Sequence, residues 1–317
     1  MIVIQVISNP YSGIITIAGN TYIKGVEKMA EAKLLIDAKQ SLAEGPFWRE
    51  ETDELYWVDI NGQAIHVYNT KTKEQREIPV DQKVGAVVLK KDGGLIMAME
   101  EGIYETDSEL KAKVLLHSPE TDRPSNRFND GKADPYGRLW AGTMPKKGSG
   151  YKGAFYRMEV DQTLTRVIDG IGNSNGLAWS PDHKYFYYID TPTGEVQCFD
   201  YDGEKGEISN PRTVVSFKDG KPDGMTIDEE GNLWIAHYGG SKVSRWNPET
   251  GERLQDVHLP VSQVTSCAFG GPERKTLFIT TARQSLTEED LKKEPLAGGI
   301  FVYETDVVGA PSYRFGK

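Results

Sequence analysis

The sequence predicts an all-β protein, a six-bladed β-propeller that carries a metal site in its central channel. Six times, at spacings of about 41 to 48 residues, a short apolar segment leads into a tight turn and a second strand rich in Leu, Trp, Tyr or Ile. Strand-turn-strand units at this period are typical of β-propellers. Oxygen-bearing side chains also recur at one position of the repeat, and no long helical period competes with the strands.

The repeats give the order of the blades along the chain. Blades are expected at residues 44–80, 84–117, 129–169, 175–216, 223–258 and from about 266. Gly, Pro and Asp lie between the paired strands, where tight turns favour them. The equivalent first-strand positions are Trp48, Leu89, Asp134, Trp179, Ile227 and Gly270.

The sixth blade lacks a fourth strand in its own part of the chain, because only a short tail follows residues 300–303. The β-prone segment 31–37 has no other partner, so we expect it to pair with residues 299–305 and close the ring. Closure removes the exposed edge that an open sheet would leave. The insertion 285–293 contains a Thr-x-x-Asp pattern, which predicts a short capped helix on a loop.

Residues 1–28 precede the first repeat and are predicted to be an N-terminal extension of uncertain order, with residues 29–317 forming a single propeller domain. The extension is apolar at its start but has no basic segment, and Asn9, Pro10 and Gly13 interrupt it. It therefore resembles neither a signal peptide nor a membrane span, and Met29 is an alternative start. A cytoplasmic protein is the default expectation.

Net charge restricts the partners of the protein. The formal charge of -10 and the pI near 5.2 disfavour nucleic acid and anionic membranes, because both require a basic face. Cys198 and Cys267 lie far apart in the sequence and form no Cys-x-x-Cys pair, so they are interpreted as buried structural thiols. The sequence does not predict an oligomeric state.

Four residues lie at the same offset in their repeats, four positions before the equivalent residues named above: Glu44, Asp130, Asn175 and Asp223. The first strand of every propeller blade lines the central channel, so residues at one offset converge on one level of the axis. Carboxylates brought together repel each other unless a cation or a shared proton compensates them. The pattern therefore predicts a cation site. Taken singly, Glu44 also fits an exposed loop, and Asn175-Gly176 and Asp223-Gly224 also fit turns.

The third blade leaves two alternatives open. Asp130 keeps the strict offset, but Asn129 would face the channel instead if the strand carries a bulge, which Gly131 permits. Arg127 offers a planar fork of donors for a hydroxyl-rich or carboxylate-bearing substrate, and a surface salt bridge is the competing interpretation.

Nucleophilic catalysis finds no support in the sequence. There is no Gly-x-Ser-x-Gly motif, and the five histidines show no His-x-x-x-His pair. His237 follows a predicted strand and is interpreted as a structural residue rather than a channel residue.

Seven motifs follow one another in a distinctive order between residues 32 and 305: Glu44-Gly45-Pro46-Phe47-Trp48, Arg127-Phe128-Asn129-Asp130-Gly131-Lys132, Ala141-Gly142-Thr143-Met144, Ser174-Asn175-Gly176-Leu177, Tyr187-Tyr188-Ile189-Asp190, Pro222-Asp223-Gly224-Met225 and Ala297-Gly298-Gly299-Ile300-Phe301. In this order they resemble the SMP-30/gluconolactonase/LRE family, also called the regucalcin or senescence marker protein family. The resemblance implies a six-bladed propeller with one divalent cation, Ca²⁺, Zn²⁺, Mn²⁺ or Mg²⁺, that hydrolyses sugar lactones.

The same resemblance assigns roles to residues. It implies that Glu44, Asn175 and Asp223 are the metal ligands, that Asp223 doubles as general base, and that Arg127 and Asn129 contact the substrate. It thereby favours Asn129 over Asp130.

One segment departs from the family pattern. Animal members carry an acidic substrate contact shortly after the Ala-Gly-Thr-Met segment, whereas Pro145-Lys146-Lys147 follows here. The preferred lactone is therefore not predicted.

The leading hypothesis is a metal-dependent lactonase that acts on a small sugar lactone. The first alternative is a calcium-binding or regulatory propeller with little catalysis. The second is a protein-interaction propeller, which would leave the channel oxygen ligands unexplained and for which WD40 and kelch signatures are absent.

Overall fold

The computed structural model describes residues 14–17, 20–23, 30–147, 150 and 152–316. Contacts divide the chain into two units, residues 1–30 and residues 31–317. In the first unit, β1 (Ile14–Ile17) and β2 (Asn20–Ile23) form an antiparallel hairpin. Most of the predicted extension lies outside the described residues, and the boundary at residue 29 stays a prediction.

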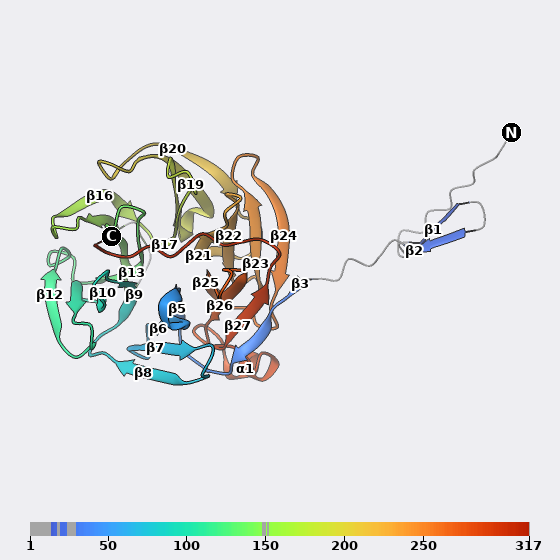
Figure 1. Ribbon diagram of the computed structural model, residues 1–317, viewed down its shortest axis with the longest axis horizontal. Coiled ribbons are helices and arrows are strands. Elements are labelled where there is room, and N and C mark those ends of the chain that lie inside the picture. The colour runs from blue at the N-terminus through green and yellow to red at the C-terminus, as the bar shows by residue number, and fades with distance from the viewer. Residues whose placement is uncertain (1–13, 18–19, 24–29, 148–149, 151, 317) are drawn as a thin grey trace. The chain divides into compact units, whose positions relative to one another are not determined.

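The second unit is a ring of six antiparallel sheets around a central axis, so the predicted six-bladed propeller is confirmed (Figure 1). Each of the first five blades runs outward from the axis in chain order. Blade one consists of β5 (Ala43–Arg49), β6 (Glu54–Asp59), β7 (Ala64–Asn69) and β8 (Gln75–Pro79). Blade two consists of β9 (Val84–Leu89), β10 (Leu95–Met99), β11 (Ile103–Thr106) and β12 (Lys113–His117).

Blades three to five repeat the same arrangement, and the sheet of blade five has an additional outer strand, β3 (Ala30–Glu31). Blade three consists of β13 (Asn126–Ala133), β14 (Leu139–Pro145), β15 (Gly153–Met158) and β16 (Leu164–Ile171). Blade four consists of β17 (Ser174–Trp179), β18 (Tyr185–Asp190), β19 (Glu195–Asp202) and β20 (Glu207–Ser216). Blade five consists of β21 (Lys221–Ile227), β22 (Leu233–Tyr238), β23 (Lys242–Asn247) and β24 (Glu252–His258).

Blade six closes the ring as predicted. Its inner strands are β25 (Val264–Gly270), β26 (Thr276–Thr281) and β27 (Ile300–Glu304), and β4 (Lys33–Ile36) pairs antiparallel with β27. Glu31, which we expected in this closing strand, belongs to β3 beside blade five instead. The chain changes sheets here, because the backbone N–H of Ala32 donates to the carbonyl of His258 on β24.

The predicted short helix is present as α1 (Glu288–Lys293). Thr287 caps it, accepting a hydrogen bond from the backbone N–H of Asp290, and the Asp290 carboxylate in turn accepts one from the N–H of Thr287. This reciprocal pair is the capping box that the Thr-x-x-Asp pattern indicated. Two 3-10 segments, η1 (Glu50–Thr52) and η2 (Thr191–Thr193), follow strands of blades one and four.

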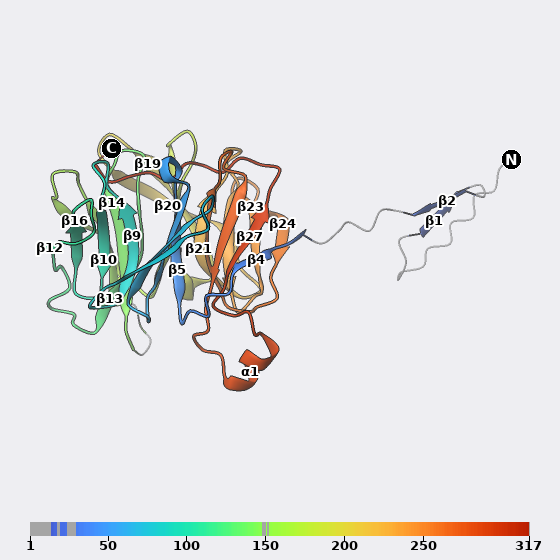
Figure 2. The same ribbon diagram turned by 60° about the horizontal axis from the view of Figure 1, so that its bottom comes forward.

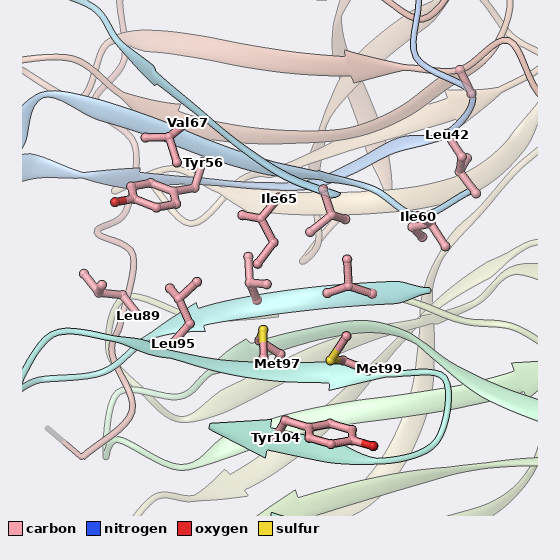
Figure 3. Packing of buried hydrophobic residues seen from close by; sticks show 14 residues of the cluster. Leu42, Tyr56, Ile60, Ile65, Val67, Leu89, Leu95, Met97, Met99 and Tyr104 are labelled. Carbon is pink, nitrogen blue, oxygen red and sulfur yellow. The ribbon is translucent and has the colours of Figure 1, made fainter. Parts of the chain in front are cut away.

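Apolar side chains pack between adjacent blades. Between blades one and two, Ile65 and Val67 lie over Leu95, Met97 and other residues of the neighbouring sheet (Figure 3). These positions alternate with the pleat, so each sheet buries both of its faces against its neighbours. No helix among the described residues is long and apolar enough to cross a membrane.

The two faces of the ring differ. The C-terminal segment, residues 307–316, crosses one face, and α1 projects from the opposite face (Figure 2). The crossing segment is bonded to the ends of the inner strands, where Ala310 donates to the carbonyl of Ile227 and Phe315 to that of Leu89. The inner strands begin at the α1 face, so residues near their starts face that mouth of the channel.

Candidate metal centre

All six inner strands are irregular near their starts, including the four that carry the candidate residues. The pairing registers shift between Glu44 and Phe47, Phe128 and Gly131, Asn175 and Leu177, and Pro222 and Met225. A bulge of this kind redirects the side chain that carries it. The residue after each candidate ligand is glycine, and Gly45 has a φ of 53°, which favours a residue without a side chain.

Glu44 and Asp223 are two buried carboxylates near the starts of the inner strands β5 and β21. They are only 6% and 7% exposed. Burial raises the pKa of Glu44, and the charge of Asp130 raises it further. Burial likewise raises the pKa of Asp223, with further contributions from the charges of Glu44 and Asp130. Buried acids that repel each other in this way are stabilised by a positive charge between them.

Asn175 presents an amide oxygen from the neighbouring blade. Its side chain is 2% exposed. Nδ2 donates to the hydroxyl of Thr191 over 2.7 Å, and Oδ1 accepts from Nδ2 of Asn129 over 2.9 Å. A carbonyl oxygen has two acceptor sites, so Oδ1 keeps one for another partner. The residue lies in β17 and not in a free Asn-Gly turn.

The charge of Arg127 interacts with the charges of both carboxylates, Glu44 and Asp223. One guanidinium nitrogen, Nη1, donates over 2.8 Å to the carbonyl of Phe128 and to Oδ1 of Asn129. No described residue accepts a hydrogen bond from Nε or Nη2, so one edge of the fork remains for a ligand. Burial lowers the pKa of Arg127 to about 10, which keeps the group charged at neutral pH. The surface salt bridge considered for Arg127 is not formed with any described residue.

The bulge in β13 turns Asn129 and Asp130 in different directions. Asn129 contacts Asn175, whereas Asp130 lines a cavity of about 80 Å³ that extends along the channel toward the C-terminal segment. Asp130 Oδ1 accepts from the N–H of Gly131 over 2.7 Å, and Oδ2 is buried without a hydrogen-bond partner. The Lys132 ammonium lines the same cavity and donates to the carbonyl of Met225. Asn129 and Asp130 therefore both line the channel, but only Asn129 forms a hydrogen bond to a candidate ligand, Asn175.

The oxygen donors suit a hard divalent cation. Within the described part of the chain, no group of three or more His, Cys, Asp or Glu is arranged to hold a metal. The candidate set instead combines two carboxylates, Glu44 and Asp223, with the amide oxygen of Asn175. Glu44 Oε2 accepts one hydrogen bond, from Gly45, and no described residue donates to the Asp223 carboxylate. Free carboxylate and amide oxygens are ligands preferred by Ca²⁺, Mg²⁺ and Mn²⁺.

Comparison with known proteins shows to which family the chain belongs. The sequence profile of the SMP-30/gluconolactonase/LRE-like region matches residues 42–283. The chain belongs to this family. Over 281 residues it is 40% identical to YvrE of Bacillus subtilis, which is provisionally named a sugar lactone lactonase, and the match covers 88% of this chain and 96% of YvrE. Regucalcin of Homo sapiens is 40% identical over 265 residues, which is 81% of this chain and 89% of that protein.

Solved structures of similar proteins have the same fold. A luciferin-regenerating enzyme superposes with a TM-score of 0.85 at 32% identity, covering 90% of this chain and 99% of that one. Regucalcin of Agrobacterium tumefaciens, described as a calcium-binding protein, superposes with a TM-score of 0.86 at 25% identity, covering 91% and 98%.

Two residues of this family member escaped the analysis of the sequence. Thr191 follows the second strand of blade four, and its hydroxyl bonds to Asn175 and to the carbonyl of Pro222. Lys132 lies inside a quoted motif, yet only the fold shows its ammonium in the channel. Neither residue occupies the offset shared by the candidate ligands, so the repeat pattern carried no signal for them.

Proposed function

We propose that this protein is a divalent-metal-dependent lactonase that opens sugar lactones. The observation that supports the proposal is a pair of buried carboxylates, Glu44 and Asp223, that repel each other. Asn175, whose amide oxygen keeps a free lone pair, is joined through Thr191 to the residue before Asp223. The family name and the lactonase name of YvrE support the reaction class. A sugar lactone, a small and neutral ring with several hydroxyl groups, also offers acceptor oxygens for the free edge of the Arg127 guanidinium.

In this proposal Glu44, Asn175 and Asp223 hold the cation. Once bound, the cation would supply Lewis-acid polarisation of the lactone carbonyl. The positive charge also favours the ionised forms of Glu44 and Asp223, which burial alone disfavours. Three protein ligands leave coordination positions for water and substrate.

Asp223 is the candidate general base. Its carboxylate takes a proton from the attacking water as the water oxygen bonds to the lactone carbonyl carbon. The ring C–O bond then breaks, and the departing ring oxygen takes this proton back from Asp223 and becomes a hydroxyl group. The product is the open hydroxy acid. Asp223 suits this role because no described residue donates a hydrogen bond to its carboxylate.

Arg127 and Asn129 are the candidate substrate contacts. The free edge of the Arg127 fork can donate to substrate oxygens and fix the orientation of the ring. The amide of Asn129 is already used by protein partners at both ends, on Arg127 and on Ser174. Asn129 would therefore act mainly by holding Arg127 in place.

The experiment that tests the proposal measures hydrolysis of gluconolactone in a pH-stat. Protein stripped with a chelator should lose activity and regain it with Mn²⁺, Ca²⁺, Mg²⁺ or Zn²⁺. Asp223→Asn should lower kcat by about 100-fold or more, because the base and one charged ligand are lost. Asp161→Asn, a change at an exposed residue that contacts only Thr163, is the matched control. Full activity of stripped protein, or of Asp223→Asn, would refute the mechanism.

A second candidate is a calcium-binding regulator with little catalysis. The description of the Agrobacterium tumefaciens relative as a calcium-binding protein favours it. Tight calcium binding by this chain without turnover of sugar, aromatic or acyl-chain lactones would select this candidate over the lactonase.

A further inference from the structure

We propose that Thr191 is a positioning residue that orients the amide of Asn175 and couples its position to that of Asp223. The inference rests on the proposed function, since it concerns two of the residues assigned there to the metal. Thr191 itself does not belong to the ligand set.

Thr191 lies at the point where blades four and five meet. It is the first residue of η2, directly after β18. Its hydroxyl accepts from Nδ2 of Asn175 over 2.7 Å and donates to the carbonyl of Pro222 over 2.8 Å. One hydroxyl group therefore joins the Asn175 side chain to the residue that precedes Asp223.

The direction of these bonds follows from the Pro222 carbonyl, which can only accept. The Thr191 hydroxyl must donate its single hydrogen to that carbonyl, so its oxygen is left to accept. Asn175 must then turn its NH₂ group toward Thr191. As a result, the amide oxygen of Asn175 points away from Thr191 and toward Asn129.

The opposite end of the chain of bonds enforces the same orientation. The carbonyl of Ser174 can only accept, and it receives Nδ2 of Asn129 over 2.8 Å. The Arg127 guanidinium can only donate, and it occupies Oδ1 of Asn129. Asn129 therefore presents a donor to Asn175, which requires an acceptor in return.

A series of hydrogen bonds thus links Arg127, Asn129, Asn175, Thr191 and Pro222, and the direction from donor to acceptor is fixed at both of its ends. It runs across blades three, four and five and passes beside both Asn175 and Asp223. Without the Thr191 hydroxyl, the Asn175 amide would lose the partner that holds its NH₂ group. Groups that orient metal ligands in this way typically contribute a factor of about 10 to 100 in metal affinity.

The test measures binding of Mn²⁺ alone, by isothermal titration calorimetry, to chelator-stripped protein. Thr191→Val keeps the shape of the side chain but removes the hydroxyl, so its Mn²⁺ dissociation constant should rise at least about 10-fold. Thr191→Ser retains the hydroxyl and should stay within about 3-fold of the unaltered chain. Thr193→Val, in the same 3-10 segment, removes a hydroxyl that bonds only to backbone and should leave Mn²⁺ affinity unchanged.

Thermal melting of each metal-free variant separates misfolding from mispositioning. Thr191→Ala replaces Thr191→Val if the latter does not fold, because both lack the hydroxyl. Weaker Mn²⁺ binding by a folded hydroxyl-free variant, with rescue in Thr191→Ser, supports the inference. Equal Mn²⁺ affinity in all variants overturns it while leaving the lactonase proposal intact. If the unaltered chain binds no divalent metal at all, the proposed function fails and the inference fails with it.

Discussion

Nδ2 of Asn129 donates to Oδ1 of Asn175 over 2.9 Å and so joins the inner strands of blades three and four. Neighbouring inner strands form no common sheet, so side chains must connect them. This bond places the free edge of Arg127 and the amide oxygen of Asn175 on one rigid unit. Substrate orientation and metal binding are therefore expected to respond together to changes at Asn129.

Asn129→Asp tests that coupling. A carboxylate at this position would face three acceptors where the amide now donates: Oδ1 of Asn173, the Ser174 carbonyl and Oδ1 of Asn175. The repulsion should lower the free energy of unfolding by about 1 to 3 kcal/mol. It should also raise the Mn²⁺ dissociation constant and KM together. Urea unfolding, calorimetry and lactone kinetics measure the three effects.

Asn61→Asp is the control for Asn129→Asp. Asn61 donates to Gln284 and Ser41 outside this chain of bonds. A drop in stability for Asn129→Asp with unchanged metal affinity and KM would show that the two functions are independent of this bond.

Much of the fold could be predicted because it depends on periodic features. The spacing of turns and apolar strands gave six blades, and the lack of a partner for residues 31–37 predicted the strand that closes blade six. The capped helix followed from local side-chain chemistry at Thr287 and Asp290. These features are set by short stretches of chain or by a repeated pattern.

The contacts inside the site could not be predicted in the same way. The choice between Asn129 and Asp130 depends on a bulge, and its register reflects pairing with β14 rather than any local preference. Thr191 and Pro222 are far from Asn129 in the sequence, and only the ring brings them to one axis. The path of residues 307–316 across the other mouth of the channel likewise leaves no periodic signal.

Acid should destabilise the protein through His237. This side chain is fully buried, bonds to the carbonyl of Asp219 and to Ser244, and has its pKa lowered from 6.5 to about 4 by burial. Between pH 6.5 and pH 4, His237 is protonated in the unfolded chain but stays neutral in the folded chain. The stability that the neutral His237 contributes is therefore fully present above pH 6.5 and is lost as the pH falls toward 4. His237 alone should contribute a loss of about 2 kcal/mol from pH 7 to pH 5, opposite in sign to the contributions of Glu44 and Asp223, whose pKa values burial raises.

Urea unfolding at the two pH values measures this loss. His237→Gln should remove the contribution of His237 to the pH dependence, whereas His117→Gln, at the half-buried end of β12, should retain it. An unaltered pH slope in His237→Gln would assign the acid sensitivity to other groups.

The C-terminal segment should contribute strongly to stability. Phe315 is 6% exposed and packs with apolar residues of blades two and three, while its backbone bonds to Leu89 and Lys91. Phe315→Ala should therefore lower the free energy of unfolding by about 3 kcal/mol. Arg314→Ala removes an exposed ion pair with Glu51 and should cost less than about 1 kcal/mol.

Metal affinity should be the same in both C-terminal variants, because this segment crosses the face opposite α1 (Figure 2). If Phe315→Ala and the unaltered chain had equal free energies of unfolding, the C-terminal segment would not contribute to the stability of the propeller.

A chain that begins at Met29 should keep the properties of the propeller. Contacts separate residues 1–30 from residues 31–317, and the closing strand β4 starts at Lys33. The shortened chain is therefore expected to melt within about 2 °C of the full chain, since that shift corresponds to about 1 kcal/mol for a domain of this size. Melting and Mn²⁺ titration of the two chains provide the comparison. A large drop in melting temperature would place residues of the extension within the folding unit.

Gly176 should be essential for the position of Asp223. A Cβ at this residue would lie 2.8 Å from the backbone oxygen of Asp223 and 2.9 Å from Cβ of Met225, closer than such atoms approach. Gly176→Ala must therefore push the inner strands of blades four and five apart, which should weaken Mn²⁺ binding and lower kcat by at least about 10-fold. Gly231→Ala is the matched control: its φ of +83° makes the substitution strained, but nothing lies within 4 Å. The control should lose about 1 kcal/mol of stability and keep its metal affinity, so weakened binding in both variants would trace to general destabilisation rather than to the spacing of the two strands.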